Sequence, residues 1–323
     1  MRTNPSVNPI TLADIQAARE RIAGSVIRTP LVRLNVRQDD AAEIYLKLEN
    51  LQPIGSFKLR GAGNAIALAD PAELAKGVYT ASAGNMAQGV AWHAQRLGIP
   101  CTVIVPDHAP ETKLAAIARL GGKFIKVTFD EWWQVVVTHH FDGVEGFFVH
   151  PVSDPAVMAG NGTIGLEILE DLPDVDTILV PYGGGGLSSG IATAVRALKP
   201  DTKVYAAEVE TSAAFAAALR AGDMIKIDYQ ASFVDGIGSS GVLPDMWPIA
   251  RDLLDGSLVS TLEEVAEAVR VLAERNRVIA EGAGATPVAA ALAGKAGTGK
   301  IACVVSGGNI DFEKLIKIFK HEL

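Results

Sequence analysis

The sequence predicts an α/β protein built on parallel sheets, and three observations support this fold class. From Gly77 onward, short apolar runs of strand character alternate with helical patterns, which is typical of βαβ units. Several strand-to-helix junctions consist of glycine and other small residues. The chain of 323 residues, with 49% hydrophobic and 20% charged residues, is long enough for two domains or one large α/β domain.

The first elements are less regular than those that follow. Residues 11–22 have the period of an amphipathic helix, with Ile15, Ala18 and Ile22 on one face. Residues 44–48 are expected to form a strand, and a helix is expected to end near Leu68.

Beyond Gly77 the alternation becomes regular. The pattern predicts strands at 78–81, 101–105, 124–128 and 147–149, and helices at 86–97, 111–120 and from 131. This block, roughly residues 71–150, is expected to form a smaller domain of its own.

A second alternating run follows. It predicts strands at 177–180, 204–209 and 301–305, and helices at 162–169, 188–198, 211–221, 262–280 and 311–319. Residues 222–258 stay unassigned because glycines and Pro244 interrupt every pattern there. Residues 1–70 and 151–323 are then expected to make the larger domain.

The bulk properties exclude several classes of partner. The formal net charge is -8, and no basic block stands out, so neither nucleic acid nor an anionic membrane is expected. No apolar run approaches the ~18 residues of a membrane span. The amino terminus lacks an apolar signal core, so a cytoplasmic protein is expected. Cys101 and Cys303 lie in apolar strand-like runs and are expected to be buried thiols.

Lys58 is the first candidate for chemistry, in the stretch Gly55-Ser56-Phe57-Lys58-Leu59-Arg60-Gly61. Ser56 is expected to cap a helix, which places Lys58 in the first helical turn. A cation is disfavoured there by the helix dipole, whereas a neutral or covalently modified lysine is not. A dry pocket would also make the amine a nucleophile. The stretch alone favours this role and that of a solvent-facing lysine equally.

Three further segments lie at strand ends. Gly183-Gly184-Gly185-Gly186-Leu187-Ser188 stands between a strand and a helix, where free N–H groups and the helix dipole bind phosphate. Ser82-Ala83-Gly84-Asn85-Met86-Ala87-Gln88 is a second such junction, and its small residues suit a carboxylate. Ser306-Gly307-Gly308-Asn309 follows the last strand and is a weak signal alone.

Together these segments resemble those of fold-type II pyridoxal-phosphate (PLP) enzymes of the tryptophan synthase beta-like fold. Within them the chain most resembles the serine/threonine dehydratase (ammonia-lyase) and serine racemase family, from Arg28-Thr29-Pro30-Leu31 to Ser306-Gly307-Gly308-Asn309. The resemblance implies two parallel-sheet α/β domains with PLP in the cleft between them, the smaller domain being mobile. It also implies a homodimer.

The resemblance assigns a role to each segment. Lys58 would form the Schiff base with PLP and act as the base, and Phe57 and Gly236 would lie on the two faces of the ring. The other implied cofactor contacts are Asn85, Gly183, Gly184, Gly185, Gly186, Leu187, Glu281 and Ser306. The substrate carboxylate would lie on Ser82, Ala83, Gly84 and Asn85, with Gln88 nearby.

Departures from the family pattern refine this interpretation. Family racemases carry a serine as second base where this chain has Ala83, which argues for a dehydratase. Trp133 stands where racemases place an arginine, which favours an apolar β-substituent, although Trp132 and Trp133 also suit helix packing. Some family members bind a cation through a glutamate and an aspartate. The chain has Glu208 but Ala214 at those positions, so no metal site is expected.

The sequence therefore predicts a PLP-dependent dehydratase that converts L-threonine or L-serine to a 2-oxo acid and ammonia. The same reaction on a bulkier substrate such as phenylserine is one alternative. An amino-acid racemase, a β-replacement synthase and a non-catalytic binding protein of the same fold are the others.

Overall fold

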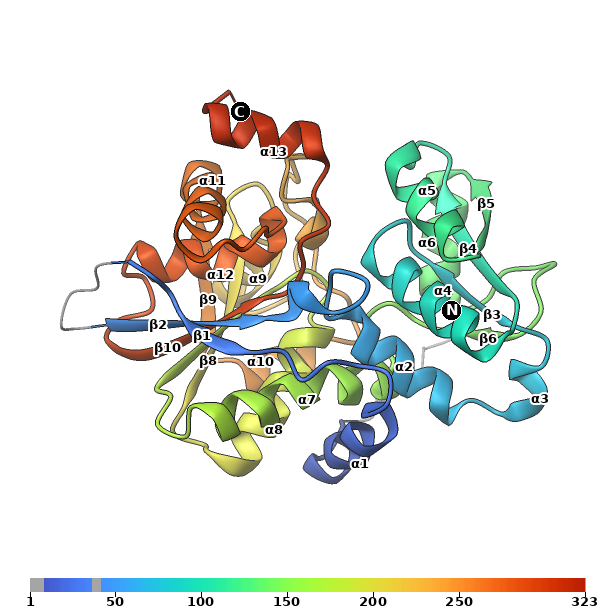
Figure 1. The fold of residues 1–323 in the computed structure, drawn as a ribbon, viewed down its shortest axis with the longest axis horizontal. Coiled ribbons are helices and arrows are strands. Elements are labelled where there is room, and N and C mark those ends of the chain that lie inside the picture. Colours follow the sequence, from blue (N-terminus) through green and yellow to red (C-terminus); the bar gives the residue numbers. More distant parts are fainter. Residues whose placement is uncertain (1–8, 37–41, 323) are drawn as a thin grey trace.

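The computed structural model describes residues 9–36 and 42–322, which contain two separate β-sheets (Figure 1). The larger sheet has six strands in the order β1-β2-β10-β7-β8-β9. These are β1 (Leu31–Arg33), β2 (Ala42–Leu48), β10 (Gly299–Val305), β7 (Thr177–Pro181), β8 (Lys203–Val209) and β9 (Gly256–Ser260). The smaller sheet has the order β5-β4-β3-β6, with β5 (Lys123–Val127), β4 (Cys101–Pro106), β3 (Val78–Ala81) and β6 (Phe147–Phe148).

Neighbouring strands run parallel throughout both sheets, except that β1 lies antiparallel to β2 at one edge. The predicted α/β class with parallel sheets is therefore confirmed. The edge strand β1 was not predicted, because three residues are too short to show a period.

Helices cover both faces of the larger sheet (Figure 1). One face packs against α11 (Leu262–Val271), α12 (Gly282–Leu292) and α13 (Phe312–Lys320). The opposite face packs against α7 (Pro155–Asp171), α8 (Gly186–Leu198), α9 (Ala214–Ala221) and α10 (Trp247–Leu253). The outermost helix, α1 (Leu12–Ile22), buries Ile15, Ala18 and Ile22 as its period predicts.

The smaller sheet has its own core. Its strands pack against α4 (Asn85–Leu97) and α5 (Glu111–Arg119) on one face and α6 (Phe129–Thr138) on the other. Helix α2 (Lys58–Leu68) packs against both α7 and α4, and the short α3 (Pro71–Leu74) leads into β3. The small sheet thus lies within the predicted block 71–150, and that block as a mobile domain stays a prediction.

Two local predictions were wrong, and one helix was not predicted. Helix α2 has Phe57, not Ser56, as its N-cap, because Ser56 forms a β-bridge with Gly307 and its hydroxyl has no partner in the described chain. The helix predicted over 262–280 ends in a π-helical turn, η3 (Leu272–Asn276), followed by Arg277 at a φ of 60°. Helix α12 was missed, because its glycines and Pro287 conceal a helix that is buried on nearly all sides.

The unassigned stretch 222–258 contains the 3₁₀ turn η2 (Asp235–Ile237), α10 and the start of β9, and another such turn, η1 (Glu49–Leu51), follows β2. Both cysteines are buried and unpaired, as predicted. Within the described ranges no helix has both the length and the apolar character needed to cross a bilayer.

Candidate functional site

The carboxyl ends of β10 and β7, which are adjacent strands, lie at the centre of the candidate site. Ser306 follows β10 and the glycine loop, residues 183–186, follows β7. In open α/β sheets this edge is where ligands bind. The Ser306 carbonyl accepts a hydrogen bond from the Phe57 N–H (2.9 Å), so the start of α2 is bound to this edge.

Lys58 is the first residue of α2 and is partly buried. Its Nζ donates a hydrogen bond to the Pro151 carbonyl (2.6 Å) and lies 5.2 Å from the centre of the Phe57 ring. Burial lowers the pKa of Lys58 to about 8, against the opposing charge of Glu281. An amine with such a pKa loses its proton easily near neutrality, so it can act as a nucleophile or a base. The functional interpretation of Lys58 is therefore favoured over the solvent-facing one.

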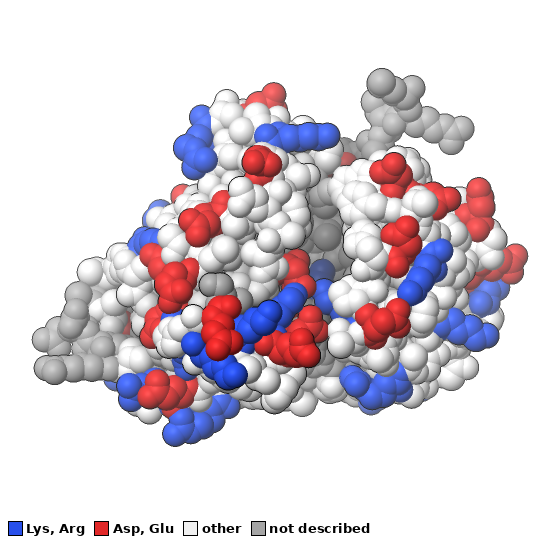
Figure 2. All heavy atoms as spheres, turned by 90° about the horizontal axis from the view of Figure 1, so that it is seen from above, with Lys and Arg blue, Asp and Glu red and all other residues white. Residues whose placement is uncertain are grey.

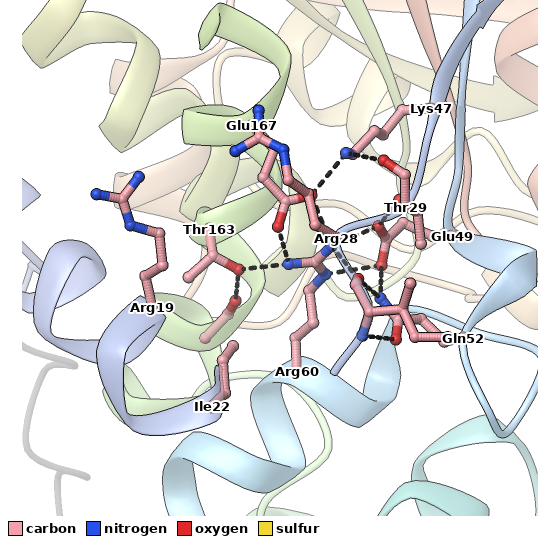
Figure 3. A network of polar contacts seen from close by, with 12 residues as sticks. Arg19, Ile22, Arg28, Thr29, Lys47, Glu49, Gln52, Arg60, Thr163 and Glu167 are labelled. Atoms are coloured by element: carbon pink, nitrogen blue, oxygen red, sulfur yellow. Dashed lines mark hydrogen bonds and ion pairs between the residues drawn. The ribbon is translucent and has the colours of Figure 1, made fainter. Parts of the chain in front are cut away.

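Arg60, two residues further on, extends from α2 into a network of buried polar side chains (Figure 3). Its guanidinium pairs with Glu49 at 2.8 Å and with Glu167 at 2.6 Å, and all three side chains are buried. Lys47 pairs with Glu167 at 2.6 Å and donates to the Thr29 carbonyl. Two cations thus face two carboxylates, which fixes α2 against η1 and α7 without leaving a net buried charge.

The glycine loop forms the start of α8, with Gly185 as N-cap at a φ of 94° and no side-chain cap. The first N–H groups of a helix have no partner inside it, so they remain available to an anion. A Cβ on Gly184 would lie 2.6 Å from Val152 Cγ1, and one on Gly186 would collide with the Val152 carbonyl oxygen. Side chains are therefore excluded here, and the loop packs closely on the segment that also holds the amine of Lys58.

The asparagine loop, residues 82–85, leads into α4 with Gly84 as N-cap. The Ser82 hydroxyl accepts from the Gly84 N–H (3.2 Å). The Asn85 amide donates to Glu281 Oε1 (2.9 Å) and accepts from the Asn309 amide (2.8 Å). This loop of the small sheet thereby contacts the ends of elements of the large sheet.

Glu281 lies just before α12 and is buried. Burial, followed by the charge of Asp235, raises the pKa of Glu281 to about 7, although the Asn85 hydrogen bond opposes this. Gly236 lies beside it, since a Cβ there would be 3.4 Å from Glu281 Oε1. The structure therefore brings Asn85, Gly236 and Glu281 together, and their contact with one cofactor stays a prediction.

A groove runs between the two halves of the molecule (Figure 2). It includes a cavity of about 160 Å³ whose lining contains Gln88, Glu281 and Asn309. Lys113 of α5 pairs across it with Asp235 (3.0 Å), and Thr112 donates to Asp311 (3.0 Å).

Trp133 is a predicted site residue whose one described ring contact, with Trp132, is not with these groups. Its side chain lies on α6, is 41% exposed and makes a ring contact with Trp132. It is not among the residues that line the cavity. Trp132, in contrast, packs into the core beneath α6.

Four residues around the site were not predicted from the sequence: His150, Pro151, Val152 and Asn309. Pro151 and Val152 act through backbone atoms and packing, for which residue type gives no signal. Asn309 stood in a quoted motif but received no role.

The Glu208 carboxylate, where a cation was considered, is buried. Its oxygens accept hydrogen bonds from the N–H groups of Phe215 and Ala216 (2.8 Å each) and from Ser257. Within the described ranges no group of three or more His, Cys, Asp or Glu residues is arranged to hold a metal.

Comparisons with known proteins agree on one family. Residues 22–307 match the model of the family described as pyridoxal-phosphate dependent enzyme. The chain is 42% identical to an L-threonine ammonia-lyase of Thermotoga maritima, over 97% of this chain and 79% of the relative. It is 37% identical to the catabolic L-threonine dehydratase of Escherichia coli (strain K12), over 96% of each. Maize serine racemase superposes with a TM-score of 0.87 at 32% identity, over 97% of this chain and 98% of that one.

Proposed function

Since the chain belongs to the family of pyridoxal-phosphate dependent enzymes, we propose that it is an L-threonine ammonia-lyase that also accepts L-serine. The observation that carries the proposal is the amine of Lys58, whose lowered pKa and position suit a base beside an anion-binding glycine loop. The two L-threonine enzymes among the relatives supply the substrate class.

The residues present fit the cofactor of this family. Lys58 offers an amine for covalent attachment, and the uncapped start of α8 offers N–H groups for the phosphate. Phe57 and Gly236 would lie on the two faces of the ring, Asn85 and Glu281 near its edge, and Ser306 at its nitrogen. When bound, pyridoxal phosphate withdraws electrons from the substrate Cα and so acidifies the proton there.

Groups of the protein would then bind the substrate and move its α-proton. The N–H groups at the start of α4, with Ser82, Ala83, Gly84 and Gln88, would hold the substrate carboxylate. Lys58 Nζ would take the α-proton as general base. The β-hydroxyl leaves as water, and the proton that it gains balances the α-proton that Lys58 removes. The released enamine then tautomerises and takes up water to give the 2-oxo acid and ammonia.

Racemisation is a weaker candidate, although serine racemase is a structural neighbour. A racemase needs a second proton donor on the face opposite the lysine. Ala83 lacks one, because its side chain is a methyl group. A bulkier substrate such as phenylserine also loses support, since Trp133 lies exposed on α6.

The proposal extends to the assembly and location of the protein. We expect a homodimer in the cytoplasm that acts on a free amino acid. Analytical ultracentrifugation of the purified protein would test the dimer, and a single sedimenting species of monomer mass would contradict it.

An absorption spectrum of the purified protein, followed by turnover assays, tests the activity. We expect a visible band of covalently bound cofactor that is absent in Lys58→Ala, together with 2-oxobutanoate formation from L-threonine. L-Serine, phenylserine and L-threonine should be assayed side by side, with and without added sulfide. Preference for phenylserine, stimulation by sulfide, or D-amino acid as the main product would each replace the proposal with the corresponding alternative. A protein that binds no cofactor would end the enzymatic interpretation.

A further inference from the structure

Residues 150–153, here called the histidine loop, contact two parts of the site at once. The loop joins β6 to α7. Its Pro151 carbonyl accepts from Lys58 Nζ (2.6 Å). Its Val152 lies against the glycine loop, since a Cβ on Gly184 or Gly186 would collide with Val152. The conformation of this loop therefore sets the position of the amine relative to the anion-binding N–H groups.

His150 is the side chain that holds this loop in shape. Its Nδ1 faces the N–H groups of Val152 (3.1 Å) and Ser153 (2.8 Å), and its Nε2 faces the Val136 carbonyl of α6 (3.2 Å). A backbone N–H can only donate and a carbonyl can only accept. These contacts therefore assign the neutral ring with its proton on Nε2, so that Nδ1 accepts.

The surroundings keep the ring neutral. The side chain is buried, and burial, followed by the charges of His139 and Lys58, lowers the pKa of His150 to about 3. The His139 ring lies 4.4 Å from it, and the nearby Asp154 carboxylate is engaged at the start of α7. A second ring proton would point at two N–H donors, so the geometry itself opposes protonation.

We propose that His150 is a positioning residue whose Nδ1 fixes the loop that presents the Pro151 carbonyl to Lys58 and Val152 to the glycine loop. This inference rests on the proposed role of Lys58. The free amine exists before the cofactor attaches and whenever Lys58 acts as a base. His150 thus acts on the reaction through Lys58, without touching the substrate.

Two substitutions separate the two ring nitrogens. In His150→Asn the side-chain oxygen can take the place of Nδ1 and accept from the loop. In His150→Gln the longer side chain places its amide nearer the position of Nε2, and the two loop N–H groups lose their acceptor. His139→Asn is the matched control, because His139 contacts the His150 ring, is exposed and occupies a left-handed position that asparagine tolerates.

The readout is the rate at which cofactor-free protein captures pyridoxal phosphate. This rate is monitored by visible absorbance and measured at several pH values. We expect His150→Asn and His139→Asn to stay within about threefold of wild type and His150→Gln to be about tenfold slower. The midpoint of the pH dependence should lie near 8 in wild type and lower in His150→Gln, because the ammonium form loses the Pro151 acceptor.

Equal slowing in His150→Asn and His150→Gln would overturn the inference, since the ring would then serve only for packing. An unchanged rate and midpoint in His150→Gln would overturn it as well. If His150→Gln does not fold, the ¹⁵N chemical shifts of the His150 ring in the wild-type holoenzyme test the proposed protonation state and tautomer instead. A neutral Nε2–H ring from about pH 5 to about pH 9 is expected, and a charged ring or the other tautomer would refute the assignment. Failure of the proposed function looks different, because wild-type protein would then capture no cofactor at Lys58.

Discussion

Replacing Arg60 with methionine tests how much the buried ion pairs between α2, η1 and α7 stabilise the fold around the site. The methionine side chain has a similar length and no charge. The guanidinium pairs with both oxygens of Glu49 (2.8 Å each) and with both oxygens of Glu167 (2.6 and 2.8 Å). Lys47 then pairs with Glu167 alone in the variant. Arg60→Met therefore leaves one buried carboxylate without a compensating cation.

The expected loss is large and depends on pH. Removing one partner of a buried ion pair costs about 3 to 5 kcal/mol. With an unfolding entropy of about 2.1 cal/mol/K per residue, this lowers the melting temperature of a chain of this length by roughly 4 to 7 °C.

The sign of the pH dependence follows from Glu49. Burial is the largest single effect and raises its pKa, but the charge and hydrogen bonds of Arg60, together with Thr29 and Lys47, more than offset it, and the pKa of Glu49 lies below its ordinary value of 4.5. Its contribution to wild-type stability is present above pH 4.5 and is lost as the pH falls through the lower folded-state value. In Arg60→Met burial dominates, so the variant loses stability as the pH rises above 4.5. The difference between the two proteins must therefore grow from acid to neutral pH.

Calorimetry of wild type and Arg60→Met at several pH values measures both quantities. Arg28→Met is the matched control, since Arg28 also pairs with two carboxylates, Glu170 and Asp171, but is about half exposed. Exposed pairs contribute about 0 to 1 kcal/mol, so Arg28→Met should melt within about 2 °C of wild type. A loss in Arg60→Met no larger than in the control, or one that is equal at acid and neutral pH, would refute the reasoning.

Three further predictions concern the cofactor, the pH dependence and metals. Gly184→Ala should weaken cofactor binding at least about tenfold in an absorbance titration, because its Cβ collides with the histidine loop, whereas Gly24→Ala meets nothing within 4 Å and should not. Glu281→Gln removes the charge that raises the pKa of Lys58, so the midpoint of cofactor capture should fall below pH 8; an unchanged midpoint would contradict this. Chelation with EDTA should leave turnover unchanged, because the Glu208 oxygens are engaged by N–H groups of α9, and restoration of lost activity by Mg²⁺ would contradict this.

The site segments that were predicted from the sequence share one property. Each lies at the end of a strand, where glycine and other small residues mark both a turn and a possible binding loop. The glycine loop is an example, since its residues are required both for the turn and for close packing, as Gly185 at a φ of 94° shows. Strand and helix patterns on either side located the junction, so fold and site could be predicted together. Helix α12 escaped because burial on nearly all sides removes the period by which helices are found.

Several contacts that were not predicted join residues far apart in the chain. Lys58 and Pro151 are 93 positions apart and meet through a backbone carbonyl, whose presence no residue type indicates. Asn85 and Glu281 are 196 positions apart, and each was predicted without the hydrogen bond that joins them. Trp133 shows the opposite error, since an alignment position suggested a role that the exposed face of α6 does not support.

The long-range contacts matter for the chemistry of the site because they set the pKa values of its titratable groups. Burial lowers the pKa of Lys58 to about 8 and raises that of Glu281 to about 7. The charge of Glu281 opposes the effect of burial on Lys58, so ionisation of this carboxyl favours the ammonium form of the lysine. His150, with a pKa near 3, stays neutral throughout and so keeps the loop that holds Lys58 in one conformation. The amine of Lys58 is thus held by a loop whose histidine ring stays neutral near pH 7, while the charge of Glu281 affects the pKa of that amine.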